Sequence, residues 1–75
     1  MFRIEYKIGY QAGQTKVYKT RIRASIAIHH NLWQKYGQSS FIFDKINAWM
    51  KWAQESNKPH NLTIVDTLRI EYTPE

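Results

Sequence analysis

The chain has 75 residues, of which 11 are lysine or arginine and 6 are aspartate or glutamate, giving a formal net charge of +5 at pH 7. It contains no cysteine, which excludes a disulfide framework and a zinc site built on thiolates. No apolar run approaches the roughly 18 residues that span a membrane. With 43% apolar and 15% aromatic residues, the composition is typical of one small folded domain, which we expect over residues 1–75 in the cytoplasm.

The first element is predicted from a strict alternation over residues 2–10, FRIEYKIGY. A period of two in a stretch rich in aromatic and β-branched residues indicates a strand with one buried face. Residues 11–14 then form a short polar loop, in which Gly13 can adopt positive φ, so a hairpin is expected. The second strand is predicted over residues 15–23. Its side chains that face the core are expected to be Tyr18, Thr20 and Ile22.

The end of the second strand is ambiguous. The alternation continues to residue 28, so the strand can extend that far. From Ile28 onward, however, apolar residues recur at helical spacing, and Ser25 and Gly37 suit the N-cap and C-cap of a helix. We therefore predict a helix over residues 25–36.

A second, longer helix is predicted over residues 39–57, where apolar residues recur every three or four positions. Ser39 or Ser40 suits its N-cap, and the helix must stop before Pro59 because proline cannot continue it. The side chains of this apolar stripe are Ile42, Phe43, Ile46, Trp49, Met50 and Ala53.

The last element is predicted as one long strand over residues 62–73, in which Asp66 interrupts the apolar row and suggests a bulge or a strand end beyond the core. The resulting order, strand-strand-helix-helix-strand, predicts a small α+β domain. It would have a three-stranded, largely antiparallel sheet with two helices packed on one face. Two successive helices should return the chain so that the third strand runs parallel to the first. Whether it lies beside the first or the second strand stays open.

The uncovered face of this sheet is predicted to be basic. Its outward positions hold six basic and two acidic residues, so they carry +4 of the total charge of +5. Lysine and arginine on such a face suit phosphate groups, which favours nucleic acid or a nucleoprotein complex as the partner. The alternative is ordinary solvation of an exposed sheet. The nucleic-acid-binding residues expected under the first hypothesis are Arg3, Lys7, Lys19, Arg21, Arg23 and Arg69.

A second candidate surface is an aromatic ridge on the longer helix. Phe41 and Trp52 project away from the apolar stripe, beside Lys45. This combination is typical of an anchor for a protein partner. The alternative is packing against the preceding helix through Trp33 or Tyr36. Under the protein-binding hypothesis, the chain is a phage or mobile-element accessory protein that inhibits a host machine, in the manner of anti-CRISPR inhibitors.

Catalysis is not expected. The sequence has no paired carboxylates at catalytic spacing, no glycine-rich phosphate loop and no cysteine nucleophile. Adjacent histidines at 29 and 30 point about 100° apart on a helix, and no ligand follows either one at a spacing of four. We therefore predict a non-catalytic binding module with no cofactor and no metal, and leave its oligomeric state open.

Overall fold

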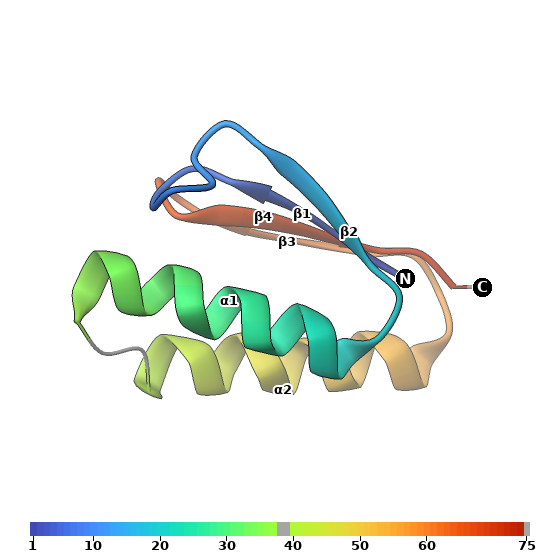
Figure 1. Ribbon diagram of the computed structural model, residues 1–75. Coiled ribbons are helices and arrows are strands. Elements are labelled where there is room, and N and C mark those ends of the chain that lie inside the picture. Colours follow the sequence, from blue (N-terminus) through green and yellow to red (C-terminus); the bar gives the residue numbers. More distant parts are fainter. Residues whose placement is uncertain (38–39, 75) are drawn as a thin grey trace.

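The computed structural model describes residues 1–37 and 40–74, which form a four-stranded sheet with two helices covering one face (Figure 1). Across the sheet the strand order is β2-β1-β4-β3, and every neighbouring pair is antiparallel. The predicted α+β class is confirmed, but three strands is wrong because the described residues contain four. The elements are β1 (Phe2–Tyr6), β2 (Thr15–Tyr18), α1 (Arg21–Tyr36), α2 (Ser40–Ser56), β3 (His60–Ile64) and β4 (Leu68–Tyr72).

Strand β1 has the predicted buried face but ends before residue 10. The strand ends at Tyr6, and the chain turns at Gly9, whose φ of 75° is in the left-handed region that glycine tolerates best. Gly13 also has positive φ, as predicted for the loop that leads into β2. The side chains that β1 buries against the helices are Phe2, Ile4 and Tyr6.

The predicted boundary between β2 and α1 is wrong, because the strand ends at Tyr18 and the helix begins at Arg21. Thr20 is the N-cap, with an extended backbone (φ −122°, ψ 153°). Its side-chain Oγ1 accepts a hydrogen bond from the N–H of Arg23 at 3.2 Å. A capping threonine thus starts the helix one turn earlier than Ser25 would.

Helix α1 ends as predicted. Gly37 has a φ of 72° and donates its N–H to the carbonyl of Trp33, which makes it the C-cap. Because the helix begins earlier than expected, Ile22 lies on its exposed side and does not face the core. The side chains that α1 buries are Ala24, Ile28, Asn31 and Leu32.

Helix α2 confirms the predicted apolar stripe. It ends at Ser56, and Asn57 follows with a left-handed φ of 56°, shortly before Pro59. The predicted N-cap Ser39 lies outside the described residues, and the side chain of Ser40 is likewise not described. Fully buried residues of the stripe are Ile46, Met50 and Ala53, and half-buried ones are Ile42, Phe43 and Trp49.

The last predicted strand is in fact the β3–β4 hairpin. Asp66, with a φ of 61°, occupies its turn, which the N–H of Thr67 closes by donating to the carbonyl of Ile64 at 3.0 Å. The turn comprises residues 65–67, an odd number, so even-numbered positions face the core on both strands. The alternation therefore passes through the turn without a break, and Asp66 marks a reversal instead of a bulge.

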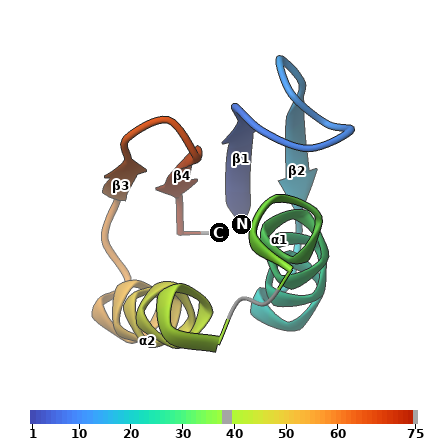
Figure 2. The ribbon, with the colours of Figure 1, turned by 90° about the vertical axis from the view of Figure 1, so that its left-hand side faces the viewer.

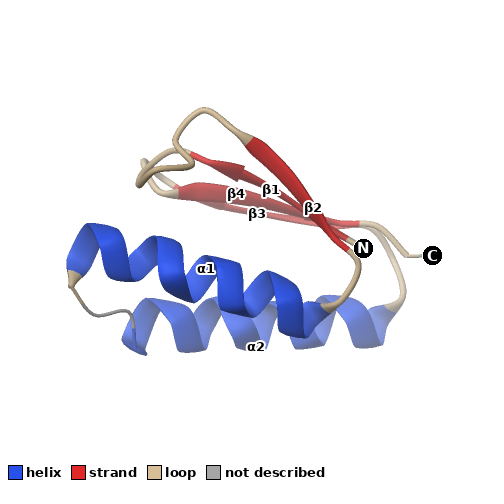
Figure 3. Cartoon of the chain, in the orientation of Figure 1, coloured by secondary structure: helices blue, strands red, loops and turns tan. Residues whose placement is uncertain are grey.

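The connections explain the all-antiparallel sheet. Helices α1 and α2 run antiparallel and return the chain to the end of the sheet it had left (Figures 1 and 3). Strand β3 therefore runs in the same direction as β1, as predicted for the strand after the helices. The hairpin then reverses the chain, and β4 inserts between β1 and β3. Viewed along the helices, α1 lies under β1 and β2, and α2 lies under β4 and β3 (Figure 2).

Candidate binding surfaces

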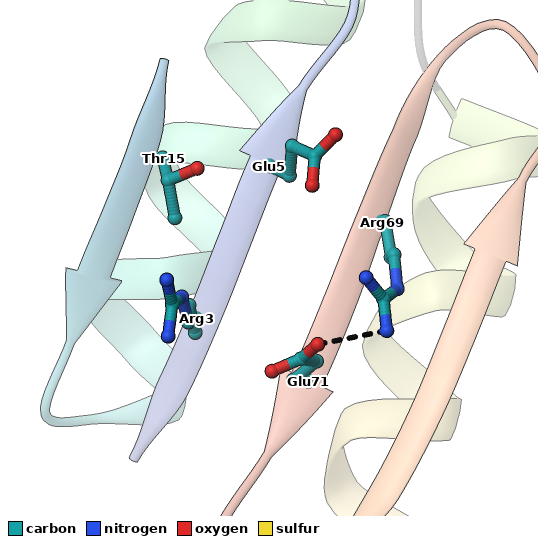
Figure 4. Close-up of a pocket in the computed structure, with 5 residues that line it drawn as sticks. All are labelled: Arg3, Glu5, Thr15, Arg69 and Glu71. Atoms are coloured by element: carbon teal, nitrogen blue, oxygen red, sulfur yellow. Dashed lines mark ion pairs between the residues drawn. The ribbon is translucent and has the colours of Figure 1, made fainter. Parts of the chain in front are cut away.

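The outward-facing residues of the four strands carry no net charge. In the observed register Arg3 is opposite Glu71, and Glu5 is opposite Arg69 (Figure 4). Arg69 also forms an ion pair with Glu71 on its own strand, with 2.9 Å between Nη2 and Oε1. Each arginine is thus matched by a glutamate. The residues that point outward from the four strands are Arg3, Glu5, Thr15, Val17, Asn61, Thr63, Arg69 and Glu71.

A polar hollow of about 170 Å³ lies between these side chains, bounded by the four charged residues and Thr15. A phosphate group placed there would meet two carboxylates as well as two guanidinium groups. Repulsion by the carboxylates offsets the attraction that phosphate binding requires. The four strands therefore do not carry the excess positive charge that was predicted for this face.

The remaining predicted basic residues lie elsewhere. Lys19 is in the short turn after β2, and Arg21 and Arg23 are in the first turn of α1, so none of the three is on the sheet. Lys7 follows the end of β1, where its N–H donates to the carbonyl of Thr67. The three residues thus lie at the corner between β2 and α1, where Arg21 reaches Asn47 of α2 and Arg23 lies on the side of β2, and they are separated from Arg3 and Arg69.

Arg21 is part of a polar tie between the helices. Its Nη1 donates to Oδ1 of Asn47 on α2 at 3.0 Å, and the Oγ of Ser25 donates to the same oxygen at 2.9 Å. Ser25, predicted as the N-cap, therefore links α1 to α2. A substitution of Arg21 would disturb helix packing as well as surface charge.

The predicted aromatic ridge of Phe41, Lys45 and Trp52 is exposed. Phe41 is 71% and Trp52 is 53% accessible, and the Nζ of Lys45 lies 4.6 Å from the centroid of the Phe41 ring. The ridge does not pack on α1 through Trp33 or Tyr36, the alternative considered above. The ring of Trp52 instead contacts His60, at the start of β3.

His60 has defined partners. The hydroxyl of Ser56 donates to the carbonyl of Ala53 at 2.7 Å, and its oxygen lies 2.6 Å from the Nε2 of His60. The side chain of His60 is thus hydrogen-bonded to the last residue of α2. The imidazole is thereby fixed in orientation beneath the indole of Trp52.

A groove of about 450 Å³ runs beside the ridge, between α2 and the edge strand β3. Lys45 lines it together with apolar side chains of both elements. Apart from Phe41, which was predicted on the ridge, the sequence pattern assigned these apolar residues to the core and did not reveal the groove, because half-buried and fully buried side chains recur at the same spacing. The apolar lining residues are Phe41, Ile42, Ile46, Trp49, Leu62 and Ile64.

Asn31 is a buried polar residue that the sequence pattern did not single out. Its Nδ2 donates to the carbonyl of Ile8 at 2.9 Å and to the Oε1 of Gln11 at 3.0 Å. On the same helix, Gln34 accepts the N–H of Tyr10 at 3.1 Å. These bonds tie the β1–β2 loop to α1, so Asn31 has a structural role.

Comparison of the chain with family models, curated proteins and solved structures finds no match. Within residues 1–37 and 40–74, no three histidine, cysteine, aspartate or glutamate side chains gather as metal ligands. None of the helices described here is long and apolar enough to cross a membrane. The surfaces described above are thus the basis for a functional proposal.

Proposed function

We propose that the protein is a non-catalytic binding module that holds a protein partner on the face formed by α2 and β3. The observation that carries this proposal is the apolar groove of about 450 Å³, which the exposed ring of Phe41 helps to line, together with the exposed ring of Trp52 on the same helix. Monomeric proteins seldom expose contiguous apolar surface of this kind without a partner for it. Tryptophan in particular is enriched among the residues that dominate binding energy.

The ridge is also pre-organised for binding. Trp52 is held by His60, and Lys45 rests on the ring of Phe41. Side chains that are already ordered lose less conformational entropy when a partner covers them. The three ridge residues can therefore serve as anchors at low entropic cost.

The test is affinity capture with immobilised protein, followed by measurement of the dissociation constant for each captured protein. Phe41→Ser and Trp52→Ser should each weaken binding at least about tenfold. Val17→Ser is the matched control, because Val17 is an exposed apolar residue of β2, at the opposite edge of the sheet from β3, and it should leave binding unchanged. Equal binding by all four proteins, or no specific partner, would overturn the proposal.

Nucleic-acid binding is a second candidate, now placed at the corner between β2 and α1. The observation in its favour is that Lys19, Arg21 and Arg23 lie within five residues of one another, and that the first turn of α1 has no acidic residue. If the partner is a nucleoprotein complex, its nucleic acid could bind this corner and its protein could bind the α2–β3 face. Under this second candidate, the predicted basic residues of the corner contact the nucleic acid, and the sheet face does not.

Binding to a labelled duplex and to a single strand, titrated across salt, tests this candidate. Phosphate contacts predict an affinity that falls steeply with salt, and a shallower slope for Lys19→Glu/Arg23→Glu. These two substitutions leave the Arg21 tie intact. Lys51→Glu/Lys58→Glu has the same net charge and should bind like the wild type. Absence of binding at low salt would remove nucleic acid as a partner.

The biological role that best fits a small binding module of this kind is inhibition of a host machine by a phage or mobile-element accessory protein. A chain without cysteine is suited to a reducing cytoplasm. In cells with active CRISPR immunity, expression of the wild type should raise phage plaque numbers, and Phe41→Ser should abolish the effect. Unchanged plaque numbers would exclude CRISPR interference as the inhibited process.

A further inference from the structure

Helix α1 carries an apolar stripe on the side that faces away from the sheet. Ile22 and Ile26 are each 65% exposed, and Trp33 is 54% exposed. With His29 they follow the spacing i, i+4, i+7, i+11, which is the a/d seam of helices that pair with other helices. The opposite side of α1 is already buried in the core, so the residues of the stripe are not needed to pack the helix against the rest of the domain.

The stripe stands between two grooves. One groove, of about 310 Å³, lies between α1 and α2 and is lined by Ile22, Ile26 and Phe43. The other, of about 520 Å³, lies between α1 and β2, where Tyr18 faces the same two isoleucines. A stripe of side chains between two grooves is complementary to another helix, whose own side chains enter the grooves. A flat lipid surface would contact only the stripe and would leave both grooves unfilled.

Charge determines which kind of helix is complementary. Helix α1 contains no aspartate or glutamate, and it carries Arg21, Arg23 and Lys35, with Lys19 just before it. Pairing two copies of α1 would bring like charges together across the seam, which disfavours a homodimer. An acidic helix would instead meet opposite charge along its length, which steers encounter and fixes specificity.

We propose that the α1 stripe docks an acidic amphipathic helix of a partner protein, with Ile22, Ile26 and Trp33 as the apolar anchors. The stripe faces away from the α2–β3 face. The two surfaces can therefore be occupied at the same time, and loss of one site leaves the other intact.

The experiment measures binding of a fluorescent amphipathic peptide with leucine at a and d positions and glutamate at e and g. A second peptide, with lysine in place of glutamate, is the matched control. The wild type should bind the acidic peptide at least about tenfold more tightly than the basic one. Ile22→Ser/Ile26→Ser should lose this binding by a similar factor, whereas Val17→Ser, at an exposed position of β2, should retain it.

A charge-swapped variant keeps the proposal testable if the serine variant unfolds. Lys19→Glu/Arg23→Glu should abolish the preference for the acidic peptide, because the two new glutamates then balance Arg21 and Lys35. Equal binding of both peptides by the wild type, or binding of neither, would overturn the proposal. So would a dimer in light scattering that Ile22→Ser/Ile26→Ser dissolves, or binding to phosphatidylserine vesicles in place of the peptide, which would assign the stripe to a second copy or to a membrane.

Discussion

The indole ring of Trp52 lies 4.3 Å from the imidazole ring of His60, between centroids, where α2 meets the first residue of β3. His60 is in turn hydrogen-bonded to Ser56, so one exposed tryptophan covers a hydrogen-bonded junction between helix and sheet. Trp52 therefore belongs both to the structure and to the proposed binding ridge. Phe41, at the other end of the ridge, is 71% exposed, and the Nζ of Lys45 lies over its ring in a cation–π contact.

These different surroundings predict different effects on stability. Trp52→Ala should lower the free energy of unfolding by about 1–2 kcal/mol, because it removes the ring contact and uncovers the histidine. Phe41→Ala should change it by less than about 0.5 kcal/mol. Urea denaturation followed by circular dichroism measures both. If the two variants are equally stable, the contact between His60 and the indole ring does not contribute to the free energy of unfolding.

The domain should lose stability at alkaline pH because the phenol group of Tyr6 is buried and hydrogen-bonded to that of Tyr18. Tyr6 is buried, its hydroxyl lies 2.9 Å from that of Tyr18, and burial followed by this hydrogen bond raises its pKa well above the usual value of 10.0. Above about pH 10 the unfolded chain releases this proton while the folded chain retains it. The free energy of unfolding should therefore be unaffected by Tyr6 below pH 10 and fall as pH rises beyond it.

The matched variant for this prediction is Tyr6→Phe. It should be less stable than the wild type at neutral pH by about 1 kcal/mol, since it removes the hydrogen bond. It should also lose less stability between about pH 9 and about pH 12, because the titrating buried group is gone. Parallel curves for the two proteins over this range would show that Tyr6 does not retain its proton.

The β1–β2 loop offers a comparison of two glycines. Gly9 and Gly13 both have positive φ, but a Cβ on Gly9 would lie 2.6 Å from the Oε1 of Gln34 and 2.7 Å from the Nδ2 of Asn31. A Cβ on Gly13 would meet nothing within 4 Å. Gly13→Ala should therefore cost only the backbone strain of about 1 kcal/mol.

Gly9→Ala should cost more, by about 1–3 kcal/mol, because it also displaces a buried amide that holds the loop. Thermal unfolding of the two variants measures the difference. Amide exchange in residues 10–14 should quicken in Gly9→Ala and stay slow in Gly13→Ala. Equal unfolding temperatures would mean that Gln34 and Asn31 move aside without loss.

The buried faces could be predicted from the sequence because burial imposes a period on the chain. The alternation of β1 and the helical spacing of α2 both follow from one side of the element touching the core. Reversals were harder to predict. Asp66 lies in a turn of odd length, so even-numbered residues face the core both before and after it. The apolar pattern is therefore the same for one long strand and for a hairpin.

The candidate sites depended on a single boundary. Residues 19–24 fit a strand by alternation and a helix by the cap at Thr20, and the choice decides where three basic residues point. As a strand they would have joined Arg3 and Arg69 on a basic face. As a helix they leave the sheet neutral and expose Ile22. Local pattern could not decide this, because the deciding contacts, such as Arg21 with Asn47, are far apart in the sequence.

Asn47 itself allows a test of how the two helices are held together. Its Oδ1 accepts from Arg21 and Ser25, so Asn47→Ala should leave two partly buried donors unpaired and cost about 1–2 kcal/mol. Asn47→Asp keeps the acceptor and places a negative charge beside the guanidinium group. It should stay within about 0.5 kcal/mol of the wild type at low salt, and lose part of that stability as salt screens the new pair. Urea titrations at low and high salt distinguish these outcomes. A wild-type stability for Asn47→Ala would mean that apolar packing alone keeps α1 against α2.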